Sequence, residues 1–208
     1  MKIFPTVVTL ATALLMLTFS ASAETLKAQN SKTIENLRAA FHGESNANRR
    51  YLAFAEKAEQ EGYGEVASLF RAAAQAEQIH ADNHAAVLKR MGIVAPPTID
   101  SVKIQSTKEN LKAAIEGESY ERDTMYPTFL KQARAENNRE AIRSFNYAKT
   151  AETEHARLYK DALGSLPNLR GKGRTYYVCT VCGYTTAKVE FASCPSCFEA
   201  KDKYKSVS

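Results

Sequence analysis

The chain has 208 residues, of which 44% are hydrophobic and 25% charged, enough for one domain of ordinary size and a small appendage. This composition is typical of a soluble globular protein. The formal net charge is +5, but no basic stripe with interleaved aromatic residues is present, so the sequence does not indicate nucleic-acid binding.

The first 23 residues differ from the rest of the chain. Lys2 is their only charge, residues 7–19 are mostly apolar, and Ala21-Ser22-Ala23 matches a small-x-small cleavage signal. An apolar run of about 13 residues is too short for a membrane-spanning helix, which needs roughly 20. We therefore predict a signal peptide over residues 1–23 and an exported, periplasmic, soluble protein that has no membrane span after cleavage.

Two long helices are predicted in the first half of the mature chain. The first covers roughly residues 31–61 and ends at Gly62-Tyr63-Gly64, and the second covers roughly residues 65–91 and ends at Gly92. The stretch from Gly92 to about Gln105 is long for a helix connection. It is therefore expected to cross the bundle rather than form a hairpin.

Two more helices are predicted in the second half. Ser106 and Glu109 have the spacing of a capping box that opens the third helix, and Pro127 within it should cause a bend. Asn137-Asn138 marks the turn into a fourth helix that runs to about residue 163 and is closed by Gly164. Four long helices with a long middle connection predict an all-α, ferritin-like four-helix bundle.

The bundle sequence is duplicated internally. ENLRAAFHGES at residues 35–45 is nearly repeated as ENLKAAIEGES at residues 109–119, and Glu77-x-x-His80 is repeated as Glu152-x-x-His155. The first pair of segments is offset by 74 residues and the second by 75. We therefore expect a two-helix unit used twice, with a one-residue difference in its turn.

Carboxylates and histidines recur in this duplication at helical spacing. Residues three apart lie on one face of a helix, so each Glu-x-x-His pair can present a carboxylate and an imidazole to one point. A single pair would be ordinary on a helix surface, but two in register, each preceded by a matching Glu, indicate a di-metal carboxylate site. The candidate ligands are Glu44, Glu77, His80, Glu118, Glu121, Glu152 and His155. The extra carboxylate, Glu121, has Ala47 as its counterpart in the first half.

Two tyrosines and two histidines complete the bundle's candidate residues. Tyr51 and Tyr126 lie about two turns beyond Glu44 and Glu118, where they could pack in the core or hydrogen-bond near the metal site. His42 and His84 have no partner pattern and are interpreted as ordinary surface or helix-packing residues.

A small C-terminal unit follows a linker at residues 166–173. Short β-type runs are predicted at residues 176–178, 183–186 and 188–191. Four cysteines in an exported protein could form disulfides, but two Cys-x-x-Cys pairs are typical of a tetrathiolate metal site. The ligands are Cys179, Cys182, Cys194 and Cys197. The pattern does not distinguish iron from zinc.

Residues 31–204 resemble the rubrerythrin family, in which a ferritin-like di-iron bundle precedes a rubredoxin-like β/metal domain. The resemblance covers nearly all of the mature chain and divides it into a bundle at 24–165, the linker at 166–173 and the rubredoxin-like domain at 174–208. Phe198 departs from the family, because a small residue is usual there and a bulky one disfavours positive φ. Family members are mostly cytosolic, so the electron donor of an exported member is left open.

The resemblance also implies particular ligands. Glu77 and Glu152 would bridge two irons, with Glu44 and Glu118 as terminal ligands and His155 on one iron. Glu121 and His80 would exchange on the other iron between oxidised and reduced states, with Tyr51 and Tyr126 beside the site. The four cysteines would hold a third iron, giving three Fe per chain, although zinc stays possible there.

The function implied is a peroxidase that reduces hydrogen peroxide to water and protects against oxidative stress. Electrons from a donor redox protein would pass through the cysteine-bound iron, from the neighbouring subunit of a head-to-tail homodimer. One alternative is a ferroxidase or iron-handling protein with structural zinc in the cysteine site. Another is a non-enzymatic metal-binding module.

Overall fold

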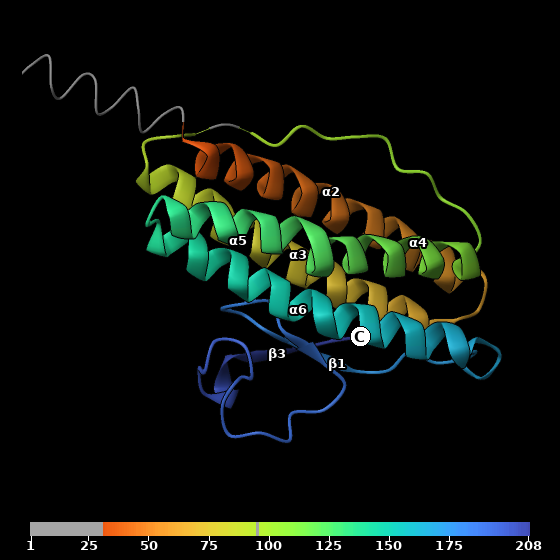
Figure 1. Cartoon of the computed structure of the whole chain (residues 1–208). Coiled ribbons are helices and arrows are strands. Elements are labelled where there is room, and N and C mark those ends of the chain that lie inside the picture. Colours follow the sequence, from red (N-terminus) through yellow and green to blue (C-terminus); the bar gives the residue numbers. More distant parts are fainter. Residues whose placement is uncertain (1–30, 95) are drawn as a thin grey trace, which may run out of the picture.

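The computed structural model describes residues 31–94 and 96–208, and the predicted signal peptide lies outside them. Figure 1 shows a long helical bundle with a small β unit against one side. Its helices are α2 (Lys32–Gln60), α3 (Gly64–Arg90), α4 (Thr107–Tyr120), α5 (Tyr126–Ala135) and α6 (Arg139–Gly164). Because α4 and α5 are continuous in direction, the predicted ferritin-like four-helix bundle is confirmed.

The two halves of the bundle cap each other's helices. Ser31 and Ser106 are the N-caps of α2 and α4, and each side chain accepts a backbone N–H three residues later. The Glu136 carboxylate, in the second hairpin turn, accepts from the N–H groups at the start of α2. The Glu61 carboxylate, in the first turn, accepts from Thr107 N of α4 at 2.9 Å. The duplication therefore appears as an approximate twofold arrangement.

The one-residue difference between the halves lies inside a helix, not in a turn as we expected. Glu44 and Glu118 are 74 positions apart, whereas Tyr51 and Tyr126 are 75 apart. Between Glu118 and Tyr126 the chain forms a π-helical turn over Glu121–Met125, where Tyr126 N donates to Glu121 O. The irregularity expected at Pro127 thus takes the form of a π turn directly before it.

Residues 91–94 and 96–106 return along the bundle, as Figure 1 shows, and the predicted crossing connection is confirmed. Polar groups of α2 hold it in place. Asn46 Nδ2 donates to Thr98 O at 2.8 Å, and Thr98 N donates to His42 Nδ1 at 2.8 Å. His42, for which an ordinary surface or helix-packing role was predicted, is half-buried and helps to hold this connection.

The C-terminal unit contains an antiparallel sheet with strand order β2-β1-β3, formed by β1 (Tyr176–Cys179), β2 (Thr185–Thr186) and β3 (Tyr204–Val207). The first two predicted β runs overlap β1 and β2. The third, at residues 188–191, was wrong because that segment forms no strand, and β3 was missed. The unit packs on α3 and α6 (Figure 1).

The linker is attached to the bundle. Arg170 donates to Glu61 O at 2.9 Å and to the Tyr63 hydroxyl at 2.9 Å, with its guanidinium over the Tyr63 ring. A Cβ at Gly64 would collide with the backbone of residues 171–173, so glycine permits this close approach. The C-terminal unit is therefore held against its own bundle.

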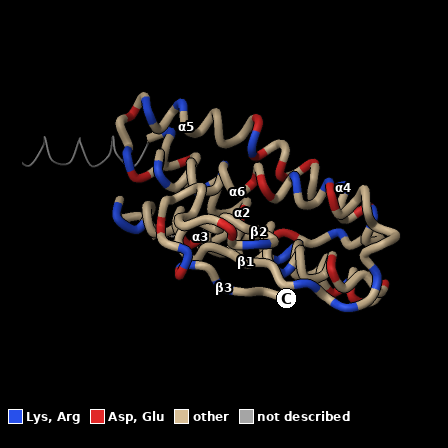
Figure 2. Tube along the Cα trace, turned by 90° about the horizontal axis from the view of Figure 1, so that it is seen from below, with Lys and Arg blue, Asp and Glu red and all other residues tan. Residues whose placement is uncertain are grey.

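Two apolar clusters occupy the bundle interior. One contains Tyr51, Phe54, Phe70 and Tyr159. The other contains Tyr126 and Phe145, with the partly buried Phe41 and Phe129 packed against it. Charges of both signs are interspersed on the bundle in Figure 2. No helix among residues 31–94 and 96–208 is long and apolar enough to cross a membrane.

Candidate metal centres

Six of the predicted bundle ligands converge in the interior. Each has a relative exposure of 1% or less, and each of four helices contributes at least one: Glu44 from α2, Glu77 and His80 from α3, Glu118 from α4, and Glu152 and His155 from α6. Buried carboxylates are rare unless they are paired or bind a metal. Four of them in one place require compensating positive charge.

The six side chains form two overlapping groups. Glu44, Glu77, His80 and Glu152 form one, and Glu77, Glu118, Glu152 and His155 form the other, with ligand atoms in each lying within 4.8 Å of one another. Glu77 and Glu152 belong to both groups. The arrangement therefore matches two adjacent metal positions that share two bridging carboxylates.

Several of the buried carboxylate oxygens that the structure describes lack a hydrogen-bond partner, as expected for ligands of a cation. Among the described residues, Glu44 Oε2, Glu77 Oε1, Glu118 Oε2 and both Glu152 oxygens are buried without a hydrogen-bond partner. His155 Nδ1 also has none, although it lies 2.8 Å from Glu152 Oε2 and 3.3 Å from Glu77 Oε1. Unpaired oxygens and an imidazole nitrogen directed at one point are the donor set of a metal ion.

The pKa values in the cluster show how strongly it needs positive charge. Burial raises the pKa of Glu118 to about 8, and the carboxylates of Glu77 and Glu152 add to the rise. Burial also raises the pKa of Glu44, with further contributions from Glu121 and Glu77. Burial lowers the pKa of His80, but Glu152 and Glu77 outweigh it and raise the value to about 10. Without a metal, protons would have to supply the compensation.

The C-terminal unit orients both histidines. His80 Nε2 lies 3.1 Å from Cys182 O and donates to it, and His155 Nε2 lies 3.0 Å from Thr185 Oγ1. Each ring therefore directs its Nδ1 at the carboxylates, which fixes the orientation that a metal ligand needs. Gly183 permits the His80 contact, because a Cβ there would overlap His80 Nε2 and lie 2.8 Å from its Cδ2.

Glu121 is placed differently from the other six. It is half-buried at the start of the π turn, and it belongs to neither four-residue group. Burial raises its pKa, Glu118 and Glu152 raise it further, and Arg50 acts in the opposite direction. The structure thus has His80 inside the cluster and Glu121 beside it.

Each predicted tyrosine hydrogen-bonds a carboxylate from the other half of the bundle. Tyr51 donates to Glu118 Oε1 at 2.5 Å, and Tyr126 donates to Glu44 Oε1. Both tyrosines are buried, so these bonds fix the outer oxygen of each carboxylate. Both roles considered, core packing and hydrogen bonding near the site, are therefore observed.

His84 is the residue that the sequence interpretation missed. It is fully buried, and its Nε2 and Nδ1 lie 3.1 Å from the Tyr126 hydroxyl and 2.8 Å from Ser144 Oγ. A surface role is therefore excluded, and helix packing describes only part of its contacts. Its position four residues after His80, on the same helix face, was the available signal.

The four cysteines form a compact cluster in the C-terminal unit. All are free thiols, with Sγ–Sγ distances of 3.7 Å for Cys179 and Cys197 and 3.5 Å for Cys182 and Cys194. A tetrahedral metal with bonds of about 2.3 Å to sulfur would hold its ligands about 3.8 Å apart. The cluster therefore fits a tetrathiolate site, and it contains no disulfide.

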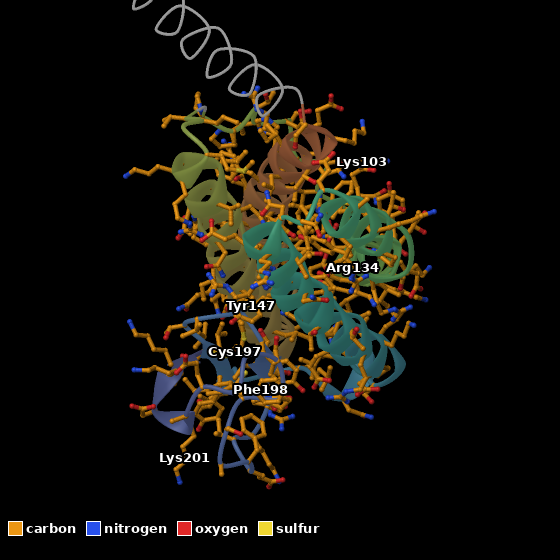
Figure 3. All side chains as sticks on the ribbon, turned by 60° about the vertical axis from the view of Figure 1, so that its left-hand side comes forward. Lys103, Arg134, Tyr147, Cys197, Phe198 and Lys201 are labelled. Carbon is orange, nitrogen blue, oxygen red and sulfur yellow. The ribbon has the colours of Figure 1, made fainter. Side chains whose placement is uncertain are left out.

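One edge of this cluster reaches the surface. Cys197 is half-buried, whereas the other three cysteines are buried. Phe198 has φ 64° and is 79% exposed, so this bulky residue adopts the positive φ that we expected it to disfavour. Tyr147 of α6 packs against the cysteine cluster, and Figure 3 labels it with Cys197 and Phe198.

A ferritin-like bundle with a di-metal carboxylate cluster, joined to a four-cysteine site, defines a class of di-iron proteins with an added thiolate metal centre. The family model for rubrerythrin matches residues 35–163. Rubrerythrin-2 of Clostridium acetobutylicum is 39% identical over 188 residues, covering 86% of this chain and 99% of the relative. Nigerythrin of Nitratidesulfovibrio vulgaris is 37% identical, covering 83% and 85%. The chain belongs to the rubrerythrin family.

Solved structures agree with this assignment. Nigerythrin in its fully reduced, all-ferrous state superposes with a TM-score of 0.78 and 35% identity, covering 85% of this chain and 90% of nigerythrin. Bacterioferritin of Desulfovibrio desulfuricans, 24% identical with a TM-score of 0.61, covers 66% of this chain and 81% of its own and shares the fold. The rubrerythrin resemblance predicted from the sequence is confirmed.

Proposed function

We propose that this protein is a peroxidase that reduces hydrogen peroxide to water, with electrons supplied through the four-cysteine centre. Its bundle ligands would be Glu44, Glu77, His80, Glu118, Glu152 and His155, with Glu121 as an exchanging ligand, and its thiolate ligands Cys179, Cys182, Cys194 and Cys197. At the bundle site, bound iron would supply two electrons to peroxide. At the thiolate site, a bound iron would act as a one-electron carrier.

The contact between the two centres carries this proposal. Cys182 contributes its sulfur to the thiolate cluster and its carbonyl oxygen to the hydrogen bond from His80, at 3.1 Å. One residue therefore belongs to one centre and touches a ligand of the other. An iron-storage protein has no need for such a connection, whereas a protein that re-reduces its bundle site does.

The chain's own residues would prepare the site for peroxide. The tyrosine hydroxyls hold Glu44 and Glu118, while apolar and aromatic side chains exclude bulk water from the cluster. The position of His80 inside the cluster and Glu121 outside it supports an exchange in which the π turn lets Glu121 move. Peroxide reduction consumes two protons, so protonated groups at the site would also be needed.

We also propose the partners and location expected from the sequence. The donor would be a redox protein in the compartment reached by the signal peptide, and the protein would be a homodimer. The resemblance implied electron transfer from the neighbouring subunit. The Cys182–His80 contact supports a route within one chain, which we favour.

A double substitution, Cys194→Ser with Cys197→Ser, tests the peroxidase proposal. We expect it to abolish donor-driven peroxide reduction, while oxidation of added ferrous iron by the bundle continues. Ser196→Ala, between the two cysteines, is the control and should behave like the wild type. Full donor-driven turnover by the double variant would overturn the proposal in favour of an iron-handling function.

The visible spectrum tests which metal the thiolates hold. We expect a red ferric-thiolate absorption that bleaches on reduction and returns when stoichiometric peroxide is added without oxygen. A colourless protein that contains zinc would instead favour a structural role for the C-terminal unit.

A further inference from the structure

A buried line of hydrogen bonds leads from the carboxylate cluster toward the surface of the bundle. Tyr126 donates to Glu44, the Tyr126 hydroxyl lies 3.1 Å from His84 Nε2, and His84 Nδ1 lies 2.8 Å from Ser144 Oγ. These residues come from α5, α2, α3 and α6. Three different helices thus place polar groups in series beside one metal ligand.

The direction of each bond follows from the first. Because the Tyr126 O–H donates to Glu44, its oxygen must accept from His84, which requires a proton on His84 Nε2. His84 Nδ1 is then an acceptor, and the Ser144 hydroxyl donates to it. Every donor in the line points toward Glu44. Burial lowers the pKa of His84 to about 3, with a further contribution from His80, so this imidazole is neutral.

The outer end of the line opens to a surface pocket. Ser144 lines a pocket of about 270 Å³ between α3, α6 and the C-terminal unit, together with Asn83, Arg90, Glu140, Arg143 and Tyr147. Ser144 is 5% exposed, so its side chain separates the pocket from the interior. A pocket of this size with a polar lining has room for several water molecules.

The other half of the bundle offers a comparison. By the 75-residue offset, His84 corresponds to Tyr159 and Ser144 to Leu69. Among the described residues the Tyr159 hydroxyl has no hydrogen-bond partner, and its ring packs on Tyr51 and Phe70. The duplication alone therefore does not require a polar line, and within residues 31–94 and 96–208 such a line of hydrogen bonds is present at Tyr126 and not at Tyr51.

We propose that Ser144, His84 and Tyr126 form a proton relay from this pocket to the carboxylate cluster. In one step the Ser144 hydroxyl proton moves to His84 Nδ1, the Nε2 proton moves to the Tyr126 oxygen, and the Tyr126 proton moves to Glu44. A water in the pocket gives a proton to Ser144 Oγ, and the hydroxide left there is neutralised by bulk solvent. One proton enters the site, and the serine, histidine and tyrosine are uncharged before and after the step. His84 is left as its Nδ1–H tautomer, which must revert to the Nε2–H form before a second proton can follow.

This inference rests on the proposed function, because peroxide reduction consumes two protons and two electrons for each peroxide. Dioxygen reduction consumes protons as well, so the relay would serve either oxidant. His84 and Ser144 are positioned to move protons without touching the metal or the oxidant. Their substitution should therefore slow oxidation and leave metal binding unchanged.

Oxidation of the pre-reduced, metal-loaded protein tests the relay by stopped flow, with peroxide and with dioxygen separately. We expect His84→Phe and His84→Gln to slow oxidation about tenfold or more, because positioned proton transfer contributes roughly 10²–10⁴-fold to rates. Gln retains hydrogen bonding but cannot pass a proton between two ring nitrogens. Ser144→Ala should slow oxidation less, since pocket water can replace the hydroxyl. Tyr159→Phe is the control at the corresponding position and should match the wild type.

Neutron diffraction from crystals of the metal-loaded protein soaked in D₂O gives a readout that is independent of activity. We expect deuterium on His84 Nε2 and none on Nδ1. Wild-type rates in His84→Gln, or deuterium on Nδ1, would overturn the relay. If the wild-type protein reacts with dioxygen and not with peroxide, the proposed peroxidase function fails. The oxidation rates of the variants with dioxygen and the neutron diffraction still test the proton relay in that case.

Discussion

The two halves of the bundle arise from one duplicated unit, yet their surroundings differ at the metal site. In the half that contains Tyr126, the tyrosine is connected through His84 to a polar pocket. In the half that contains Tyr51, the tyrosine is enclosed by Phe54, Phe70 and Tyr159. We call these the open half and the closed half. The comparison indicates that the duplication supplied the ligands, whereas the residues around them connect one tyrosine to a polar pocket and enclose the other.

The shared carboxylates should matter more than those that belong to one half. Glu77→Ala removes a ligand from both four-residue groups, whereas Glu44→Ala and Glu118→Ala each affect one. We expect Glu77→Ala to lower affinity for the bundle metals more than 100-fold, beyond the roughly 10–100-fold typical of losing a supporting residue. Metal content per chain measures this, with exposed Glu116→Ala as the control. Equal losses in all three ligand variants would contradict the assignment of shared ligands.

Gly183 brings the thiolate centre against His80 of α3, and its substitution should give the next largest effect. Gly183→Ala should cost about 1–3 kcal/mol for its φ of +78°. A further cost of about 1–3 kcal/mol should come from the collision with His80.

The control for this substitution is Gly171→Ala. Gly171 has φ +98°, but a Cβ there would meet nothing within 4 Å, so only the backbone cost should apply. Denaturant unfolding measures both variants. Equal destabilisation would show that the C-terminal unit does not contact His80 as described.

Much of this architecture could be predicted from the sequence, because its signals are local. Caps such as Ser31 and Ser106 and the turn residues Gly62 and Asn137 set the helix ends within about one residue. Helical periodicity placed the Glu-x-x-His pairs on the interior faces. These features depend on neighbours within a few positions of the chain.

The remaining features depend on contacts that the sequence order does not reveal. The duplicated sequence shows that the second half has one extra residue, but it does not show whether that residue forms a π turn or lengthens a loop. The bonds of His84 involve two other helices, and packing determines them. The final strand, Tyr204–Val207, is too short and polar to be distinguished from a tail, and it forms because β1 offers an unpaired edge.

Removing the hydroxyl of Tyr126 should lower the free energy of unfolding more than removing the hydroxyl of Tyr51. Tyr126→Phe leaves both Glu44 Oε1 and His84 Nε2 without a partner, whereas Tyr51→Phe leaves only Glu118 Oε1. A buried polar group without a partner costs about 1–3 kcal/mol. We therefore expect Tyr126→Phe to lower the free energy of unfolding by about 1–3 kcal/mol more than Tyr51→Phe. Urea unfolding of the metal-loaded protein measures both, and equal values would mean that His84 does not depend on Tyr126.

The smallest expected effect concerns the two turn glutamates, where the halves also differ. Burial acts to raise the pKa of Glu136, but hydrogen bonds from Thr33, Ser31 and Gln132 outweigh it and lower the value to about 2. Hydrogen bonds from Thr107 lower the pKa of Glu61 as well. A carboxylate whose pKa is depressed on folding stabilises the protein above its usual value of 4.5, and this contribution is lost as the pH falls toward the folded value.

Glu136→Gln should therefore lower stability at neutral pH by about 1 kcal/mol or less, since the carboxylate faces the start of α2 from an exposed position. The difference from the wild type should shrink between about pH 4.5 and pH 2, as the wild-type carboxylate takes up its proton. Glu61→Gln should show a smaller difference, because its carboxylate accepts one backbone bond from α4 where Glu136 accepts two from α2. Thermal unfolding across this pH range measures both. A gap that widens in acid would mean that Glu136 folds with a raised pKa, and that the two turns do not cap the opposite helices as charged groups.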